Sequence, residues 1–207
     1  MRQDNILILF AKAPVVGYVK TRLIPDYSPS QACVIHQQLL EYSLAMLADQ
    51  PAVDVVLYCA PDQQHSYFQS LQDLYNIKLE DQPPGNLGQK MSTVLSQALL
   101  NYKKVVLIGS DIPAINQQYV SKAFAVLDQS PVVIGPAEDG GYVLVGLTAP
   151  MPRMFDDIAW GEANVLQQSM EKLQPEIPVL LETLWDVDRP EDVARFLQLK
   201  ANNSSLP

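Results

Sequence analysis

The chain has 207 residues, of which 48% are hydrophobic and 18% charged, and this composition suits one globular α/β domain with a sizeable core. Its 14 lysines and arginines stand against 23 aspartates and glutamates, which gives a formal net charge of −9 and argues against nucleic acid as a partner. No apolar run approaches the roughly 18 residues of a membrane span, and the N-terminus has no secretory signal pattern, so we expect a cytoplasmic protein without a membrane partner.

A short apolar run over 6–11, near the N-terminus, is typical of a strand buried in a sheet that helices cover on both faces. The loop that follows carries Lys12, Lys20 and Arg22, and its Gly17 permits conformations closed to other residues and a close approach of a ligand to the backbone. Open α/β sheets bind ligands at the carboxyl ends of their strands, so three cations here on an acidic chain predict a phosphate-binding loop. The alternative is a solvated basic loop, and neither a P-loop nor a dinucleotide fingerprint is present.

Strand-like and helix-like segments alternate after this loop, as in a mostly parallel sheet. The first helix begins with a capping box, in which Ser28 is the N-cap and Gln31 stands three positions on. Cys33 and Cys59 fall within expected elements, so we expect reduced packing residues and no disulfide. The expected elements are, in chain order, helix 28–48, strand 52–59, helix 62–75, strand 77–80, helix 89–102, strand 105–109, a helix capped by Asn116, strands 132–135 and 142–147, helix 163–173, strand 177–181 and a helix from about 190 to 200, followed by a frayed tail at 202–207.

A stretch rich in proline and glycine, 82–88, leads into the helix expected from 89. A loop of this kind that opens a helix offers backbone N–H groups to an anion or to the edge of a base. Gly88 is therefore a candidate nucleotide-binding residue, and a plain connection is the alternative.

Asp111 directly follows the expected strand 105–109, where a carboxylate is costly unless it has a cation partner. Because it should lie across the end of the sheet from the cationic loop, it is a candidate metal ligand and catalytic residue. The alternative is a residue that only initiates a turn before the next helix.

Two further acidic segments follow. Glu138, Asp139, Gly140 and Gly141 connect the two strands over 132–147 in a loop longer than a tight hairpin needs, so they are candidate substrate-binding residues or only a hairpin connection. Near the C-terminus, Asp188 with Glu191 three positions on predicts a helix cap, whereas Asp186 lies outside that cap. Both aspartates are candidates for a second metal carboxylate.

The segments quoted above recur together, in order, over nearly the whole chain. They are residues 10–14 (FAKAP), Gly17, 20–23 (KTRL), 109–113 (GSDIP), 138–142 (EDGGY) and 186–192 (DVDRPED). As a set they resemble a bacterial family of nucleotide-diphospho-sugar transferase-like proteins with the GT-A fold. Its members are commonly labelled glycosyltransferases, some in arsenosugar biosynthesis contexts. The set is more distantly similar to molybdenum cofactor guanylyltransferases and phospholactate guanylyltransferases.

The resemblance implies a single Rossmann-like domain over 1–201 with helices on both faces of a mostly parallel sheet and one antiparallel strand. It also implies a nucleotide over the first loop and a divalent metal, Mg²⁺ or Mn²⁺, near Asp111. Two positions depart from the pattern, since Asp111-Ile112-Pro113 stands where glycosyltransferases of this fold usually carry D-x-D, and Arg189 where relatives often have Thr.

The predicted site residues are compatible with two reactions, sugar transfer and nucleotidyl transfer. In sugar transfer a metal would stabilise the departing diphosphate, and Asp139 could remove the acceptor proton. In nucleotidyl transfer an acceptor phosphate would attack the α-phosphate of a triphosphate, whose charge the loop cations would neutralise. We expect a glycosyltransferase-like enzyme that uses a nucleotide sugar and a small-molecule acceptor, with Asp111, Asp139 and Lys20 as catalytic residues. A nucleotidylyltransferase and a non-catalytic nucleotide-binding relative are the alternatives.

Overall fold

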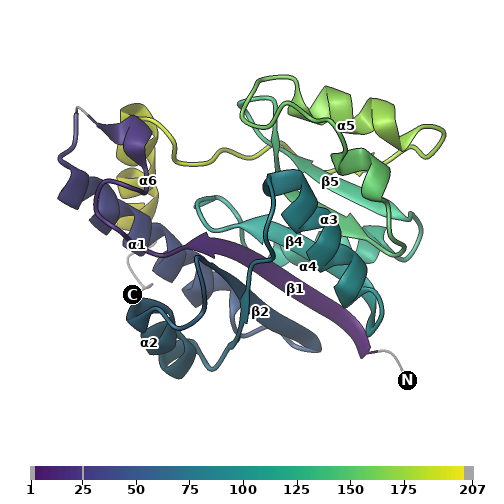
Figure 1. Cartoon of the computed structure of the whole chain (residues 1–207), viewed down its shortest axis with the longest axis horizontal. Helices are drawn as coiled ribbons and strands as arrows, with labels where there is room; N and C mark the ends of the chain where they lie inside the picture. The colour runs from purple at the N-terminus through teal and green to yellow at the C-terminus, as the bar shows by residue number, and fades with distance from the viewer. Residues whose placement is uncertain (1–2, 25, 203–207) are drawn as a thin grey trace.

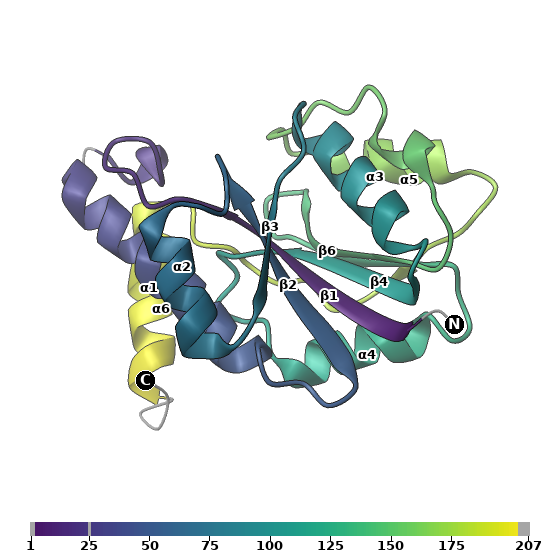
Figure 2. The same ribbon diagram turned by 60° about the horizontal axis from the view of Figure 1, so that its bottom comes forward.

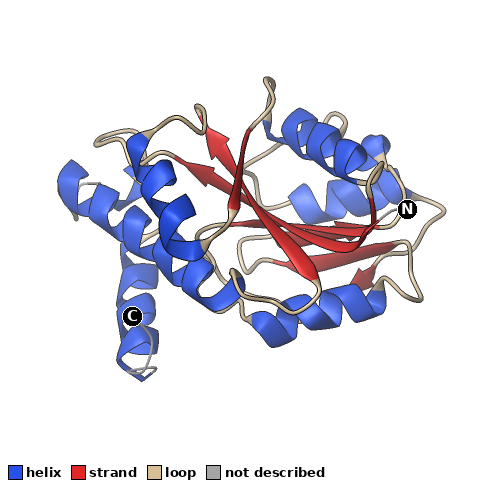
Figure 3. Cartoon of the chain, turned by 90° about the horizontal axis from the view of Figure 1, so that it is seen from below, coloured by secondary structure: helices blue, strands red, loops and turns tan. Residues whose placement is uncertain are grey.

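The computed structural model describes residues 3–24 and 26–202. Its centre is a seven-stranded sheet in the order β3-β2-β1-β4-β6-β5-β7, with helices on both faces (Figure 1, Figure 3). Strand β6 runs antiparallel to both of its neighbours, and the other neighbours in the sheet pair in parallel. The predicted fold class, a mostly parallel sheet with one antiparallel strand, is confirmed.

The elements alternate along the chain as expected. In order they are β1 (Gln3–Lys12), the 3-10 helix η1 (Thr21–Leu23), α1 (Pro29–Leu47), β2 (Val53–Ala60), α2 (Ser66–Tyr75), β3 (Lys78–Asp81), α3 (Leu87–Ala98), β4 (Tyr102–Gly109), α4 (Gln117–Val126), β5 (Val132–Pro136), β6 (Tyr142–Leu147), the 3-10 helix η2 (Pro152–Phe155), α5 (Val165–Leu173), β7 (Val179–Leu180) and α6 (Pro190–Asn202).

Helix caps explain where the expected boundaries hold and where they move. The capping box of α1 is confirmed, since the Ser28 hydroxyl accepts from the Gln31 backbone N–H at 3.3 Å. Helix α3 begins at Leu87, two residues earlier than expected, because Asn86 and Gln89 form a capping box that the sequence pattern did not lead us to predict. Helix α2 begins at Ser66 rather than 62, because the imidazole of His65 caps it.

The other differences lie at element ends. Helix α3 ends at Ala98, so that β4 starts at Tyr102 and not at 105. Helix α5 begins at Val165, and β7 is only two residues long. Asn202, expected in the tail, is the last residue of α6, and 203–207 lie outside the described residues.

Each face of the sheet carries its own core. Buried side chains of α1, α2 and α4 pack on one face, and those of α3, η2 and α5 pack on the other. A third, smaller core joins α6 to α1, where the ring of Phe196 meets Tyr42 edge-on at 5.6 Å between centroids. Cys33 and Cys59 are buried and free, as predicted.

The topology gathers the ends of several strands at one edge of the sheet. Because β1 pairs in parallel with both β2 and β4, their carboxyl ends meet at the same edge. The segment that precedes α6 crosses this edge from the β5 side of the sheet toward α1 (Figures 1 and 2). It is tied there by the backbone N–H of Val187, which donates to the Asp111 carbonyl at 3.0 Å. Among the described residues, no helix is both long enough and apolar enough to cross a bilayer.

Candidate active site

Three adjoining cavities form one groove along this edge. The loop pocket, about 400 Å³, lies over the end of β1 and is lined by Lys12, Lys20, Arg22 and His36. The Trp160 pocket, about 220 Å³, lies between α3 and the loop after β5. The acidic pocket, about 580 Å³, lies beside the segment before α6, and its lining includes Glu138, Asp139, Glu162, Asp186 and Asp188. Asp111 lines both the loop pocket and the Trp160 pocket, and Asp186 lines both the Trp160 pocket and the acidic pocket, so neighbouring cavities share walls.

The cationic loop and Asp111 meet as the sequence predicted. The Lys20 ammonium lies 2.6 Å from Oδ2 of Asp111 and donates to the Val187 carbonyl at 2.5 Å. Only 7% of the Lys20 side chain is exposed, and its backbone is left-handed, with φ of 49°. Burial opposes ionisation of Asp111, but the adjacent Lys20 charge prevails and holds the pKa of Asp111 below its usual value. Lys20 therefore ties the loop to the end of β4.

Arg22 takes a different carboxylate. Its guanidinium lies 2.5 Å from Oδ2 of Asp188. The predicted cap, in which Asp188 would pair with Glu191, is wrong because the Asp188 carboxylate faces Arg22. Instead the Asp192 carboxylate accepts from the backbone N–H groups of Asp188 and Arg189, at 3.0 and 2.7 Å.

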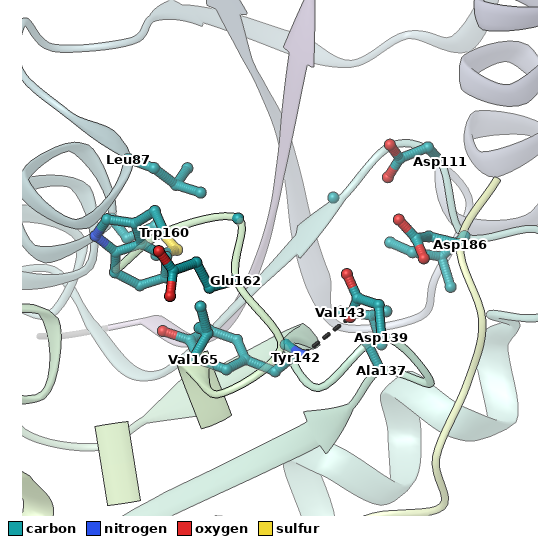
Figure 4. Close-up of a pocket in the computed structure, with 15 residues that line it drawn as sticks. Leu87, Asp111, Ala137, Asp139, Tyr142, Val143, Trp160, Glu162, Val165 and Asp186 are labelled. Carbon is teal, nitrogen blue, oxygen red and sulfur yellow. Dashed lines mark hydrogen bonds between the residues drawn. The ribbon is translucent and has the colours of Figure 1, made fainter. Parts of the chain in front are cut away.

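Asp186 has no such cation. Burial, then the nearby charges of Asp111 and Asp139, raise the pKa of Asp186 to about 6. Figure 4 shows the three carboxylates following one another along one side of the Trp160 pocket. The described residues contain no group of three metal-ligating side chains close enough to enclose an ion.

The residues of the loop between β5 and β6 lie in two different environments. The Asp139 carboxylate accepts from the Gly141 N–H at 2.9 Å, and both residues line the Trp160 pocket. Glu138 instead forms a bidentate pair with Arg195 of α6, at 2.9 and 3.2 Å. Gly140 has φ of +89°, and a Cβ there would lie 1.9 Å from the Ala163 carbonyl oxygen. Gly140 is thus required by packing.

Gly88 also has a packing role. It is buried in the first turn of α3, and a Cβ at this position would lie 2.6 Å from the Phe155 carbonyl and 2.7 Å from the Trp160 indole nitrogen. Its neighbour Leu87 lines both the loop pocket and the Trp160 pocket. Gly17, by contrast, has φ of +83°, and a Cβ at this position would meet no atom within 4 Å, as in an open turn.

Sequence reasoning missed several residues of the groove. His36 on α1 is buried, with its Nε2 atom 2.8 Å from the Lys12 carbonyl, and burial lowers the pKa of this imidazole. The Gln82 amide donates to the ends of β1 and β2, at the carbonyls of Ala11 (3.1 Å) and Tyr58 (3.0 Å). A lone histidine or glutamine carries no sequence signal, because only the fold brings it to the pocket.

Comparisons with known proteins agree with this geometry. Residues 43–162, more than half of the chain, match a family model described as "Uncharacterized protein conserved in bacteria (DUF2064)". The chain belongs to the DUF2064 family. A search of curated proteins found no match to this DUF2064 protein.

Solved structures share the fold over nearly its whole length. A candidate nucleotide-diphospho-sugar transferase from Desulfovibrio desulfuricans G20 is 28% identical, with a TM-score of 0.83 over 99% of this chain and 96% of that one. The 4-diphosphocytidyl-2C-methyl-D-erythritol synthase of Anaerococcus prevotii DSM 20548 is 10% identical, with a TM-score of 0.64 over 98% and 97%. The Rv0371c protein of Mycobacterium tuberculosis H37Rv, solved with manganese, is 14% identical, with a TM-score of 0.56 over 96% and 100%. The predicted resemblance of this DUF2064 protein to nucleotide-diphospho-sugar transferase-like proteins is confirmed.

Proposed function

We propose that this protein is a nucleotide-utilising transferase that moves a sugar from a nucleotide sugar to a small-molecule acceptor. The observation that carries the proposal is the division of charge between two adjoining cavities at one edge of the sheet. The loop pocket is lined by three cations, and the adjoining Trp160 pocket by three aspartates, with Asp111 shared between them. A diphosphate suits the first part and a hydroxyl-rich group the second. The similar protein from D. desulfuricans G20, a candidate nucleotide-diphospho-sugar transferase, supports this assignment.

In the proposed reaction an acceptor hydroxyl oxygen attacks the anomeric carbon of the donor sugar. The bond between that carbon and the diphosphate oxygen breaks, and the electron pair leaves with the nucleoside diphosphate. Asp139 is exposed and lines the Trp160 pocket, so its carboxylate can take the proton of the hydroxyl. Lys12, Lys20 and Arg22 balance the charge that develops on the leaving diphosphate.

The residues present suit a divalent cation. Asp111 and Asp186 are close enough for the charge of one to raise the pKa of the other, and a cation between them would relieve that repulsion. Mg²⁺ usually takes one or two protein carboxylates and completes its shell with substrate phosphate oxygens and water. Asp111 and Asp186 both line the Trp160 pocket and would therefore hold the metal, whereas Asp188 does not line that pocket. When bound, the ion would add positive charge beside the leaving diphosphate.

Nucleotidyl transfer is the second candidate. Three cations around one pocket suit a triphosphate, and cytidylyltransferase-type proteins share the fold, among them a CMP:2-keto-3-deoxy-manno-octonic acid synthetase solved with CTP. In that reaction an acceptor oxygen would attack the α-phosphorus, and pyrophosphate would leave with the bonding electron pair.

The nucleotide assignment is tested by removing two loop cations. Lys20→Ala with Arg22→Ala should weaken nucleotide binding by at least tenfold in isothermal titration, because two charge-assisted contacts to phosphate are lost. The matched control is Lys103→Ala with Lys122→Ala, which also removes two cations that pair with carboxylates, Asp4 and Glu182, outside the groove. Equal affinity of the two folded double mutants would reject the phosphate-binding role of the loop.

Competition between ligand classes separates the two reactions. With Mn²⁺ present, nucleoside diphosphate sugars should displace a bound fluorescent nucleotide at lower concentration than nucleoside triphosphates, because the Trp160 pocket adds contacts to the sugar. Turnover should release a nucleoside diphosphate. Preference for a triphosphate, with pyrophosphate released in the presence of a phosphorylated acceptor, would establish nucleotidyl transfer instead. Metal-dependent turnover of either kind would exclude a non-catalytic role.

A further inference from the structure

The Trp160 pocket has two walls of opposite character. One wall is apolar and is made by Leu87, Met91, Tyr142, Trp160 and Val165. The other carries the carboxylates of Asp111, Asp139 and Asp186, and the exposed Glu162 lies beside Trp160 (Figure 4). No lysine, arginine or histidine is among the residues that line it, in contrast to the loop pocket next to it.

The apolar wall is held in place by close packing. The edge of the Trp160 indole lies against Gly88, where no side chain larger than hydrogen fits, and the ring of Tyr142 meets it edge-on at 6.1 Å between centroids. The Trp160–Glu162 turn is fixed from the other side, because the chain around Ala163 lies directly on Gly140. The Leu166 N–H then donates to the Gly140 carbonyl at 3.0 Å. An indole that packs against Gly88, on a turn whose next residue packs against Gly140, is a preorganised surface, which lowers the entropic cost of binding a ligand.

The charge of the acidic wall determines which ligands can bind against the apolar wall. Of its three aspartates only Asp111 contacts a lysine, so in the metal-free protein a phosphomonoester in this pocket would face the negative charges of Asp139 and Asp186 with no cation among the lining residues. A neutral sugar ring fits both walls, because its C–H face can lie on the indole while its hydroxyls donate to the carboxylates. We propose that the Trp160 pocket binds an uncharged sugar ring and excludes sugar phosphates.

The ring has two possible sources, the sugar of the nucleotide donor and a free acceptor sugar. Their chemistry in this pocket is the same, and the role of the ring in catalysis rests on the proposed function. The selection by charge does not, since it can be measured without any nucleotide.

Tryptophan fluorescence reports on the pocket directly. The chain has two tryptophans, and Trp185 stacks under the Arg195 guanidinium at 4.2 Å, away from the Trp160 pocket. In a Trp185→Phe background the emission therefore comes from Trp160 alone. Titration with glucose, galactose, mannose and N-acetylglucosamine should change this emission, and the 6-phosphate of the best ligand should bind at least tenfold more weakly.

One variant tests the negative charge of the pocket, and another tests its apolar wall. Glu162→Lys should reduce the preference for the neutral sugar over its 6-phosphate, whereas Glu171→Lys on α5, at an exposed position away from the pocket, should leave it unchanged. Trp160→Ala, followed by saturation-transfer NMR because its own signal is lost, should abolish binding of the sugar. Equal or tighter binding of the 6-phosphate to the parent, no response to any of the four neutral sugars, or undiminished sugar binding by Trp160→Ala would overturn the proposal.

The source of the ring follows from a second titration. UDP-glucose, GDP-mannose and ADP-glucose are each compared with their own nucleoside diphosphate. A gain in affinity from the sugar that Trp160→Ala removes assigns the ring to the donor, and binding of the free sugar beside a nucleoside diphosphate assigns it to the acceptor. If no nucleotide binds but neutral sugars still do so at Trp160, the proposed function fails and the sugar pocket stands.

Discussion

Lys20 is the residue at which the two charged parts of the groove meet. Its ammonium donates to the carboxylate of Asp111, which follows β4 and is 91 positions away in the sequence. It also donates to the carbonyl of Val187, which is 167 positions away. The sequence predicted that the loop after β1 and the acid after β4 face each other at one edge of a parallel sheet, and it proposed Asp186 or Asp188 as a second acid there. It could not predict that the Lys20 ammonium reaches the Val187 carbonyl between those two aspartates, because a backbone acceptor leaves no signal in the side-chain pattern.

Asp186 is a second residue whose surroundings could not be predicted from the sequence. Its sequence position marked it as an acid outside the α6 cap, but only the fold reveals that it is buried beside Asp111 and Asp139, which raises its pKa from 3.8 to about 6. A carboxyl that binds its proton more tightly in the folded state favours folding below about pH 4. That contribution is lost as the pH rises through about 6.

Asp186→Asn should therefore stabilise the metal-free protein at neutral pH. The amide keeps the site uncharged, so the free energy of unfolding should rise by about 1–2 kcal/mol at pH 7.5 and hardly change at pH 4. Urea denaturation at the two pH values measures this. Asp188→Asn is the control, because it removes a carboxylate that faces Arg22 and should not stabilise the protein. Equal effects of Asp186→Asn at both pH values would contradict a raised pKa.

At the scale of elements, caps and strand ends were the predictable part of the fold. The Ser28–Gln31 box fixed the start of α1, and the antiparallel pairing of β5 with β6 followed from two strand runs joined by a short acidic loop. The shape of that loop was not predictable. It depends on contact with the turn after η2, and such contacts between loops leave no periodic signal in either segment.

Gly140 and Gly17 both have positive φ, but they should respond differently to alanine. Gly140→Ala adds a Cβ 1.9 Å from the Ala163 carbonyl oxygen, so it should destabilise the protein by about 3 kcal/mol or more. Gly17→Ala has the same unfavourable backbone angle but open space around it, and should cost only about 1 kcal/mol. Thermal and urea denaturation of both variants compare them. Similar losses would show that the turn after η2 does not pack on the loop between β5 and β6.

At the scale of the whole molecule, the sequence identified both sides of the groove but not its aromatic wall. The cations of the first loop, Asp111 and the loop between β5 and β6 are strand-end features, and parallel topology gathers strand ends. Trp160 reaches the groove from the irregular segment after η2, and its position depends on Gly88 of α3. Short motifs at strand ends therefore predict binding sites better than single aromatic residues in irregular segments do.

The prediction of a single domain is tested at the junction furthest from the sheet. Helix α6 buries Phe196, 1% exposed, against α1, while its neighbour Leu197 is 53% exposed. Phe196→Ala should lower the free energy of unfolding by about 3–5 kcal/mol, and Leu197→Ala by about 1 kcal/mol or less. If α6, α1 and the sheet form one cooperative unit, circular dichroism and fluorescence should follow one shared transition in Phe196→Ala at lower denaturant concentration. Because α6 directly follows Asp186 and Asp188, a separate early transition confined to α6 would instead mean that the acidic side of the groove can open while the sheet stays folded.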